Sequence, residues 1–382
     1  MKKKSMLIIA GEISGDMHAA ALVRALQKRG MNVDIFGIGG DELRAAGMEI
    51  IVDAREMAVL GLTDVLLKYR FFRKTFYAML TLARERRPDA ILLVDYPGFN
   101  LRFAAQAHAQ GLKVLYYICP QVWAWNRSRV PRMARIVDRL IAIFSLEADV
   151  FKGTGLPVDF VGHPLVTAAR RTMAEPLVCL PWQGGEPCVA ILPGSRYHEV
   201  KRILPTMWSA AVLLERRFPN ASFIVAAPSD QVAQWIRDTL DGLDRGPARW
   251  SVVIGQTRQA LRQARAAMVT SGTATIETAL MRCPMIVVYK TSWITYGLGR
   301  LVIRVPFLGM VNIVAGEGLC PEFIQHRATP RALAGGLEPL LRDSPARTSM
   351  LNGLDLVIAA MGEPGAEERA ADIVLAELSL RK

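Results

Sequence analysis

The sequence predicts an α/β protein built from two facing, Rossmann-like, doubly wound domains, each with a parallel sheet covered by helices. Short, wholly apolar runs alternate along the chain with helical segments, a pattern typical of buried parallel strands joined by crossover helices. The chain has 382 residues, more than the ~250–300 at which a single hydrophobic core stops growing. Each half also restarts with a strand, a glycine-bearing loop and a helix, so we expect two similar domains.

The order of the apolar runs sets the expected boundaries. A first domain covers residues 1–165, a connection covers residues 166–187, and a second domain covers residues 188–345. C-terminal helices occupy residues 346–382. The runs that predict strands lie at residues 5–10, 32–37, 50–52, 89–94, 113–118, 140–144, 158–162, 188–192, 222–226, 251–254, 267–270 and 285–289.

The first strand ends in a glycine-bearing loop, residues 11–16, which opens a helix over residues 17–28. The glycine spacing matches neither the dinucleotide-binding fingerprint nor the P-loop. Glu12 and His18 nevertheless place ionisable groups at the carboxyl end of a strand, the edge at which open α/β sheets bind ligands.

Asp95 follows the strand at residues 89–94 and precedes a Pro-Gly turn, while Asn100 is expected to cap a helix over residues 101–110. Asp95 therefore lies at the same sheet edge as Glu12 and His18. Such an aspartate is either a turn former or a general base. Because Asn100 already supplies the cap, the pattern favours the base.

In the second half, the strand at residues 267–270 leads through Ser271, Gly272 and Thr273 into a helix that Ser271 or Thr273 is expected to cap. The open N–H groups of such a helix N-terminus favour phosphate. Glu277 lies near the same end of the helix. It would accept hydrogen bonds from ribose hydroxyls, or would only complement the helix dipole.

Arg196 emerges beside Ser195 from a Gly-Ser turn after the strand at residues 188–192. A guanidinium in this place can hold a phosphate bidentately, although an exposed turn also accommodates a simple surface arginine. No Asp-X-Asp motif occurs in the chain. We therefore expect no metal held by paired carboxylates for a diphosphate.

The charge and the cysteines narrow the class of protein. A net charge of +12 and a pI near 9.7 imply an anionic partner. Lys and Arg are scattered and no nucleic-acid motif occurs, so a nucleic acid is not expected. Five cysteines without a Cys-X-X-Cys pair indicate a reducing cytosol and no zinc site. The longest apolar stretch, residues 298–314, contains two arginines and a proline and cannot span a bilayer.

A helix over residues 65–80 is the expected membrane-facing element. Its apolar stripe, which includes Tyr69, would dock the helix on its own domain, leaving Leu67 and Phe71 exposed among lysines and arginines. Exposed apolar side chains interleaved with basic ones are typical of an interfacial helix on an anionic leaflet. Residues 293–307 are the next candidate.

Six motifs, taken together, resemble those of the lipid-A-disaccharide synthases. They occur in the family's order between about residues 7 and 325, and they are Ala10-Gly-Glu-Ile-Ser-Gly-Asp16, Asp95-Tyr-Pro-Gly-Phe-Asn100, Pro120-Gln-Val-Trp-Ala-Trp125, Gly162-His-Pro164, Leu192-Pro-Gly-Ser-Arg196 and Ser271-Gly-Thr-Ala-Thr-Ile-Glu-Thr278. The resemblance implies the two-domain GT-B glycosyltransferase fold and an inverting, metal-independent enzyme without a cofactor.

The implied reaction transfers 2,3-diacylglucosamine from its UDP derivative to 2,3-diacylglucosamine 1-phosphate, forming the β-1,6 lipid A disaccharide and UDP. The resemblance also implies action at the cytoplasmic face of the inner membrane and a homodimer with exchanged C-terminal segments. Some members carry a second Asp where this chain has Gly98, so the base is placed at Asp95, assisted by His18 or Glu12.

The expected substrate-binding residues follow from the same comparison. They are Arg196, Ser195, Ser271, Gly272 and Thr273 for the diphosphate, Glu277 for the ribose, and also Asn100 and Asn312, the latter in a motif near the donor. Two alternatives stay open. One is a UDP-N-acetylglucosamine 2-epimerase or another GT-B enzyme acting on a soluble sugar. The other is a non-catalytic nucleotide-sugar binder.

Overall fold

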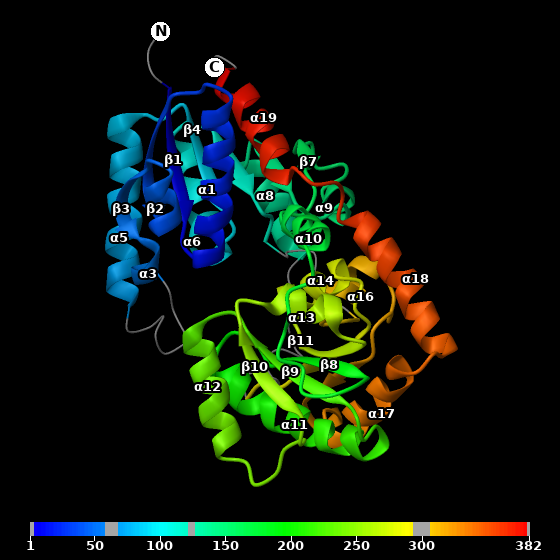
Figure 1. Ribbon diagram of the computed structural model, residues 1–382. Coiled ribbons are helices and arrows are strands. Elements are labelled where there is room, and N and C mark those ends of the chain that lie inside the picture. Colours follow the sequence, from blue (N-terminus) through cyan, green and yellow to red (C-terminus); the bar gives the residue numbers. More distant parts are fainter. Residues whose placement is uncertain (1–3, 58–67, 121–126, 293–305, 380–382) are drawn as a thin grey trace. The chain divides into compact units, whose positions relative to one another are not determined.

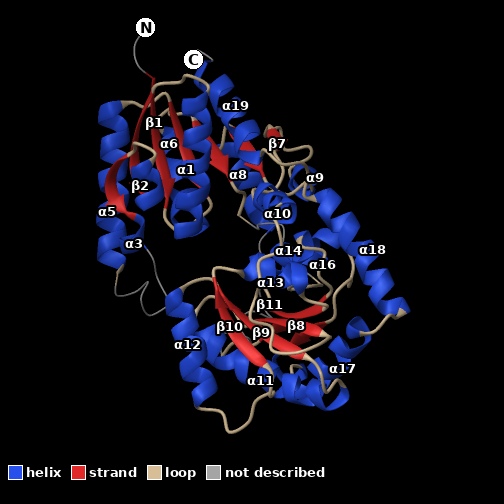
Figure 2. Cartoon of the chain, viewed as in Figure 1, coloured by secondary structure: helices blue, strands red, loops and turns tan. Residues whose placement is uncertain are grey.

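The computed structural model describes residues 4–57, 68–120, 127–292 and 306–379. It divides the chain into two compact units (Figure 1). Unit 1 comprises Met1–Pro164 together with Gly362–Lys382, and unit 2 comprises Leu165–Met361. Each unit contains its own sheet between helices, as the strands and helices of Figure 2 show. The predicted α/β class is therefore confirmed.

Unit 1 contains a seven-stranded sheet in which every strand pairs in parallel with its neighbours. Its spatial order is β3 (Glu49–Asp53), β2 (Val33–Gly39), β1 (Lys4–Ala10), β4 (Ala90–Val94), β5 (Val114–Tyr117), β6 (Arg139–Ala142) and β7 (Val158–Phe160). Side chains on both faces of the central strands are buried, which explains why these strands are continuous apolar runs.

The helices of unit 1 pack on the sheet in two groups, one around α1 and α19 and one around α5, α6 and α8. Their bounds are α1 (Ile13–Lys28), α2 (Asp41–Ala45), α3 (Ala54–Met57), α5 (Tyr69–Arg86), α6 (Pro97–Ala109), α8 (Val130–Ile136) after a 3₁₀ turn (Arg127–Arg129), α9 (Leu146–Val150) and α19 (Ala366–Ser379).

Unit 2 contains a six-stranded parallel sheet in the order β10 (Trp250–Ile254), β9 (Ser222–Ala227), β8 (Cys188–Leu192), β11 (Ala266–Thr270), β12 (Met285–Tyr289) and β13 (Glu322–Ile324). Its helices are α10 (Leu165–Ala174), α11 (Tyr197–Arg217), α12 (Asp230–Asp241), α13 (Thr257–Gln263), α14 (Thr273–Leu280), α16 (Met310–Ala315), α17 (Pro330–Leu341) and α18 (Pro345–Ala360), with a 3₁₀ turn at Gln325–Arg327.

Both sheets reverse their strand order at one place. In unit 1 the reversal lies between β1 and β4, and in unit 2 between β8 and β11. Loops that leave neighbouring strands in opposite directions open a crevice at the carboxyl edge, and this crevice is where doubly wound sheets bind ligands. Each unit therefore has one predicted ligand edge.

The C-terminal segment is shared between the units. Helix α18 belongs to unit 2, whereas α19 packs against α1 in unit 1. Two ion pairs hold α19 there. Lys113 Nζ lies 3.0 Å from Glu377 Oε2 in a buried pair, and the half-buried Arg139 lies 3.2 Å from Glu377 Oε1. The residues expected as a connection, 166–187, include most of α10, which packs on α13 and α14.

Two expected helix starts were wrong, and one strand was not expected. Helix α1 begins at Ile13 and not at residue 17, so the glycine-bearing loop is almost entirely the first turn of the helix. Helix α6 begins at Pro97, because proline fits the first helical position and its missing N–H costs nothing there. The short strand β13 was not expected from the sequence.

Candidate active site

The two loops at the ligand edge of unit 1 begin at the same level. Ala10 and Val94, the last residues of β1 and β4, are paired in register. The loops also touch, because a Cβ at Gly11 would lie 2.6 Å from the ring of Tyr96. Only glycine allows this approach. The arrangement brings Glu12 and Asp95 close enough for their charges to interact, as the sequence predicted.

Asp95 is held in an uncommon backbone conformation. Asp95 and Tyr96 both have positive φ, 45° and 48°, a conformation that is uncommon for non-glycine residues and recurs at active sites. The Asp95 carbonyl accepts hydrogen bonds from the Tyr116 hydroxyl at 2.6 Å and from Asn100 Nδ2 at 2.8 Å. These two contacts fix the turn that presents the carboxylate.

The electrostatic environment tunes the Asp95 carboxyl. Burial raises its pKa to about 6, and the negative charge of Glu12 adds to the shift, while a hydrogen bond from the Tyr96 N–H opposes it. A base is most effective when its pKa lies near the working pH. Asp95 therefore has the properties of a general base, and Glu12, which is exposed, influences it through its charge.

His18 lies in the second turn of α1 and is half-buried. Burial lowers its pKa, so the imidazole is neutral at pH 7. Its neighbour His163, from the Gly162-His-Pro164 motif, packs against the ring of Phe144 with a centroid distance of 5.1 Å. Burial and the proximity of His18 lower the pKa of His163 to about 3. His18 thus remains able to accept a proton.

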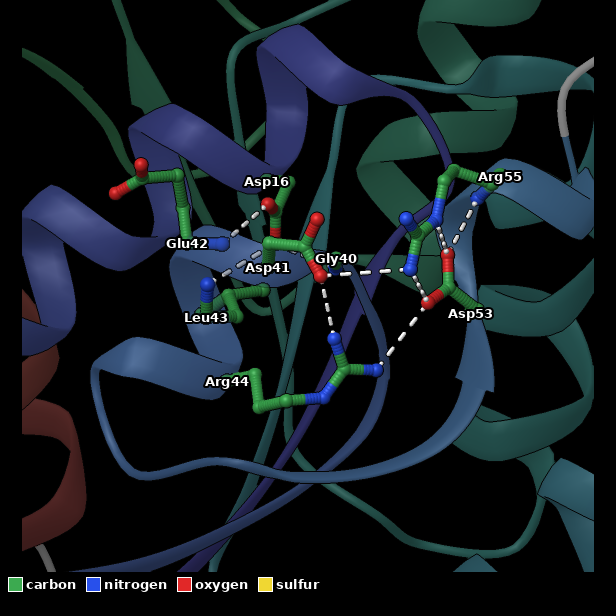
Figure 3. Close-up of polar contacts among 8 residues, drawn as sticks. All are labelled: Asp16, Gly40, Asp41, Glu42, Leu43, Arg44, Asp53 and Arg55. Carbon is green, nitrogen blue, oxygen red and sulfur yellow. Dashed lines mark hydrogen bonds and ion pairs between the residues drawn. The ribbon is translucent and has the colours of Figure 1, made fainter.

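Asp16, the last residue of the first motif, has a structural task (Figure 3). Its carboxylate accepts hydrogen bonds from the backbone N–H groups of Gly40 at 2.6 Å, Glu42 at 3.0 Å and Leu43 at 3.2 Å. Asp16 therefore satisfies the open donors at the start of α2, which has no cap of its own. The exposed ion pairs of Asp53 with Arg44 and Arg55 lie beside it.

The prediction that Asn100 caps a helix was wrong. Asn100 lies one turn inside α6 and is fully buried, so it does not cap the helix. Its Nδ2 donates to the carbonyls of Val94 and Asp95, at 3.2 and 2.8 Å. Asn100 therefore supports the turn that carries Asp95.

Unit 2 has a pocket of about 350 Å³ at its own ligand edge. It includes six of the expected substrate-binding residues, which come from the loops after β8 and β11 and from the first turns of α14. These are Ser195, Arg196, Ser271, Gly272, Thr273 and Glu277. Leu192 and Val269, near the ends of the two strands, are paired in register, so the two loops start side by side.

The N-terminus of α14 opens into this pocket without a side-chain cap. Its N-cap residue is Gly272, with φ 132°. The prediction that Ser271 or Thr273 caps this helix was therefore wrong. Ser271 Oγ instead donates to the Leu308 carbonyl at 2.8 Å. In the described part of the chain, the N–H groups of Gly272 and Thr273 have no backbone partner. They remain available for an anion.

The N-terminus of α11, in contrast, is occupied by a carboxylate of the protein. Glu199 accepts hydrogen bonds from the N–H groups of Ser195 and Arg196, at 3.1 and 3.3 Å, and pairs with the Arg196 guanidinium at 3.3 Å. The Arg196 side chain is 76% exposed. Because an exposed ion pair is worth ~0–1 kcal/mol, Arg196 can leave Glu199 for a phosphate at little cost.

Glu277 has a partner that the sequence did not reveal. Arg258 Nε donates to Glu277 Oε1 at 2.8 Å, which leaves Oε2 for another donor. Arg258 belongs to α13, which follows the edge strand β10. The neighbouring Thr257 also lines the pocket, as do Thr270 and Pro228. The sequence places these three residues only at or just after strand ends, a position that many other residues share.

Asn312 does not line the pocket. It is fully buried, and its amide joins α16 to the segment before β13 through Cys320 and Glu322, with three contacts of 2.8 Å. These contacts use its donor and its acceptor. Asn312 therefore positions the backbone behind α14 instead of binding a ligand directly.

The side chains predicted to be exposed on the membrane-facing helix differ from those that are exposed on α5. Val65 and Leu67 lie outside the described residues, as do residues 121–126 and 293–305. Phe71 was expected to be exposed, but it packs against the core. Tyr69, expected on the docking stripe, is 59% exposed, and so is Tyr77 at 57%. None of the described helices is long and apolar enough to cross a bilayer.

Comparison with known proteins decides the family. The model of the lipid-A-disaccharide synthetase family matches residues 6–370. A lipid-A-disaccharide synthase from Syntrophus aciditrophicus is 39% identical over 377 residues, which cover 98% of each chain. The chain belongs to this family. It is a disaccharide-forming glycosyltransferase of lipid A synthesis, as the sequence motifs indicated.

Solved structures agree on the fold. A calicheamicin glycosyltransferase superposes with a TM-score of 0.60 and 16% identity, covering 99% of each chain. A UDP-GlcNAc 2-epimerase from Neisseria meningitidis, bound to UDP-GlcNAc, gives 0.59 and 12% identity, covering 98% of this chain and 99% of the epimerase. At these identities the likeness shows the fold alone, so the GT-B expectation is confirmed. The epimerase alternative gains no support from it.

Proposed function

We propose that Asp95 is the general base of the lipid A disaccharide transfer and that the pocket of unit 2 binds the UDP part of the donor. One observation carries the proposal for Asp95. Its carboxylate stands on a turn with positive φ at the ligand edge of unit 1, with a pKa raised to about 6. A raised pKa together with a turn of positive φ at a ligand edge is typical of a catalytic carboxylate.

The proposed chemistry balances without a further reactant. Asp95 takes the proton from the 6-hydroxyl of 2,3-diacylglucosamine 1-phosphate. The resulting oxygen bonds to C1 of the donor sugar as the bond from C1 to the diphosphate breaks, which inverts C1 and gives the β-1,6 linkage. The leaving UDP carries the negative charge, and the N–H groups of Gly272 and Thr273, with Arg196, stabilise it.

Glu277 is proposed to accept hydrogen bonds from the ribose of UDP. We expect Glu277→Gln to weaken UDP binding about tenfold, because a neutral amide forms weaker hydrogen bonds than a carboxylate. Calorimetry with UDP and with 2′- and 3′-deoxy-UDP measures this. At least one deoxy ligand should bind wild type and variant alike. The exposed Glu175→Gln, in the same unit and paired with Arg171, serves as the control. Equal losses for all three ligands would show that Glu277 does not touch the ribose.

The central experiment is turnover of the defined substrates. Purified protein is incubated with UDP-2,3-diacylglucosamine and 2,3-diacylglucosamine 1-phosphate, and the product mass and the anomeric configuration are determined. We expect the β-linked disaccharide and one UDP per turnover, with no loss of rate in EDTA. Donor cleavage that does not depend on acceptor, or formation of a 2-epimer, would contradict the proposal.

Membrane association and a homodimer complete the proposal. The support for the first is the net charge of +12 and the exposed Tyr69 and Tyr77, with Arg73 between them on α5. The support for the second is α19, whose attachment to α1 can be exchanged between two copies. Co-sedimentation with anionic vesicles and equilibrium sedimentation test these two statements separately.

A further inference from the structure

An aromatic cavity lies beside the Asp95 turn in unit 1. Its volume is about 480 Å³, within the ~300–1,000 Å³ that small-molecule sites occupy. The rings come from α5, α6 and the turn itself, and they are Tyr69, Phe72, Phe76, Tyr77, Tyr96 and Phe99. Phe76 packs edge-on against Phe99, with the centroids 5.5 Å apart, so this wall is preformed. Such a lining suits an apolar chain.

A second, smaller cavity adjoins the first and is basic. Its volume is about 160 Å³, and its lining contains Arg102, Arg129 and Arg132. The three arginines are exposed, and none has a carboxylate partner among the residues that the structure describes. Unpaired guanidinium groups around a small hollow match a phosphate monoester, which accepts bidentate hydrogen bonds from arginine.

The two cavities share a wall formed by Gly98 and Arg102. Gly98 follows Asp95 by three residues, a length of chain that spans at most ~11 Å. Arg129 is also electrostatically close to the turn. Burial raises the pKa of Tyr116, whose hydroxyl donates to the Asp95 carbonyl, and the charge of Arg129 acts against that rise. The turn that carries the proposed base therefore lies within ~11 Å of chain from the wall that both cavities share.

We infer that the two cavities form one acceptor subsite, in which the aromatic cavity holds an acyl chain and the arginine cavity holds the 1-phosphate. This inference rests on the proposed function. In an acylated sugar 1-phosphate, the phosphate is on C1 and an acyl group is on the neighbouring carbon C2. Two adjacent groups of this kind fit two cavities that share a wall. The 6-hydroxyl, carried by C6 on the ring carbon opposite C2, is left to face Asp95.

The phosphate part is tested with the double variant Arg129→Met, Arg132→Met. We expect kcat/KM for the acceptor to fall about tenfold to a hundredfold, since charge-assisted hydrogen bonds are lost, while the affinity for UDP is unchanged. With an acceptor that lacks the 1-phosphate, variant and wild type should react equally slowly. The control is Arg135→Met, on the same helix α8 and outside the cavity lining. If the double variant lowers kcat/KM equally for the acceptors with and without the 1-phosphate, the arginine cavity does not bind that phosphate.

The acyl part is tested with Gly98→Trp. Among the described residues, no atom lies within 4 Å of a Cβ built at Gly98, and a helical glycine gains helix propensity on substitution, so we expect α6 to accept the change and the indole to enter the cavities. We expect kcat/KM to fall at least tenfold with long-chain acceptor in detergent and much less with a short-chain acceptor. Gly335→Trp, at an equally open helical glycine of unit 2, is the control.

The outcomes separate this inference from the proposed function. Wild-type turnover alone decides the proposed function, whatever the variants do. If Gly98→Trp slows short- and long-chain acceptors equally, the cavity does not hold the acyl chain. If the arginine variant loses vesicle binding but keeps its kcat/KM in detergent, the arginines bind membrane phospholipid, and the acceptor subsite is refuted.

Discussion

Asp95→Asn is expected to lower kcat by ~10²–10⁴-fold, the usual contribution of general base catalysis, and to leave the affinity for UDP unchanged. The amide keeps the shape of the carboxylate but cannot take the proton of the acceptor hydroxyl. The Tyr116 and Asn100 contacts go to the Asp95 carbonyl and not to its side chain, so the turn should survive. Single-turnover rates and calorimetry with UDP measure the two quantities.

The pH profile supplies a second signature of the same residue. Because the pKa of Asp95 is raised to about 6 and the base must be ionised, the wild-type rate should fall as the pH drops through 6. Glu12→Gln removes one cause of the raised pKa, so its acid limb should shift to lower pH. The residual rate of Asp95→Asn should lack this limb.

The competing base is His18, whose neutral imidazole lies at the same edge. If Asp95→Asn turns over within a few-fold of wild type while His18→Gln abolishes the reaction, the role belongs to His18. Thermal unfolding of both variants checks that neither loss comes from misfolding.

Glu377→Ala is expected to destabilise unit 1 by about 3 kcal/mol or more, because breaking one partner of a buried ion pair costs ~3–5 kcal/mol. Lys113 and Glu377 are each only 8% exposed. The truncation leaves the Lys113 ammonium with the Glu377 carbonyl, at 2.7 Å, in place of the carboxylate. Arg139 keeps its contact with Asp159, at 2.7 Å. Urea unfolding at fixed protein concentration measures the change.

The matched control replaces both buried partners. Lys113→Met with Glu377→Leu leaves no uncompensated charge, and well-packed apolar residues often replace a buried ion pair without loss. The double variant should therefore recover most of the stability that Glu377→Ala loses. If the single and the double variant are equally unstable, the helix contact itself, and not the charge, is what matters.

Much of the fold could be predicted because both sheets are buried on both faces. A parallel strand such as β4 or β11 must then be apolar throughout, and this leaves a clear signal in one sequence. Helix starts were predicted less well. Asn100 has the chemistry of a cap, yet Pro97 begins the helix and tertiary contacts with strand ends take the amide instead.

The residues of the candidate site could also be predicted only in part. Asp95, Arg196 and Glu277 could be placed because each follows directly from a strand end or a helix start. The sequence could not place Arg258 or the arginines of the basic cavity in a site. These residues come from helices whose position depends on packing across the sheet. Asn312 matched a motif, but its burial is decided by Cys320 and Glu322, which no local pattern identifies.

The placement of α19 in unit 1 has a consequence for biosynthesis. Residues 165–361 form a complete unit that can fold as soon as they leave the ribosome. Unit 1, although its synthesis starts earlier, cannot be completed until α19 has been synthesised. Domains generally fold as units in the order of synthesis. Here the surface of α1 that receives α19, and the Lys113 ammonium that Glu377 neutralises, stay uncovered until α19 has emerged. The nascent chain therefore passes through a stage in which its second unit is finished and its first is not.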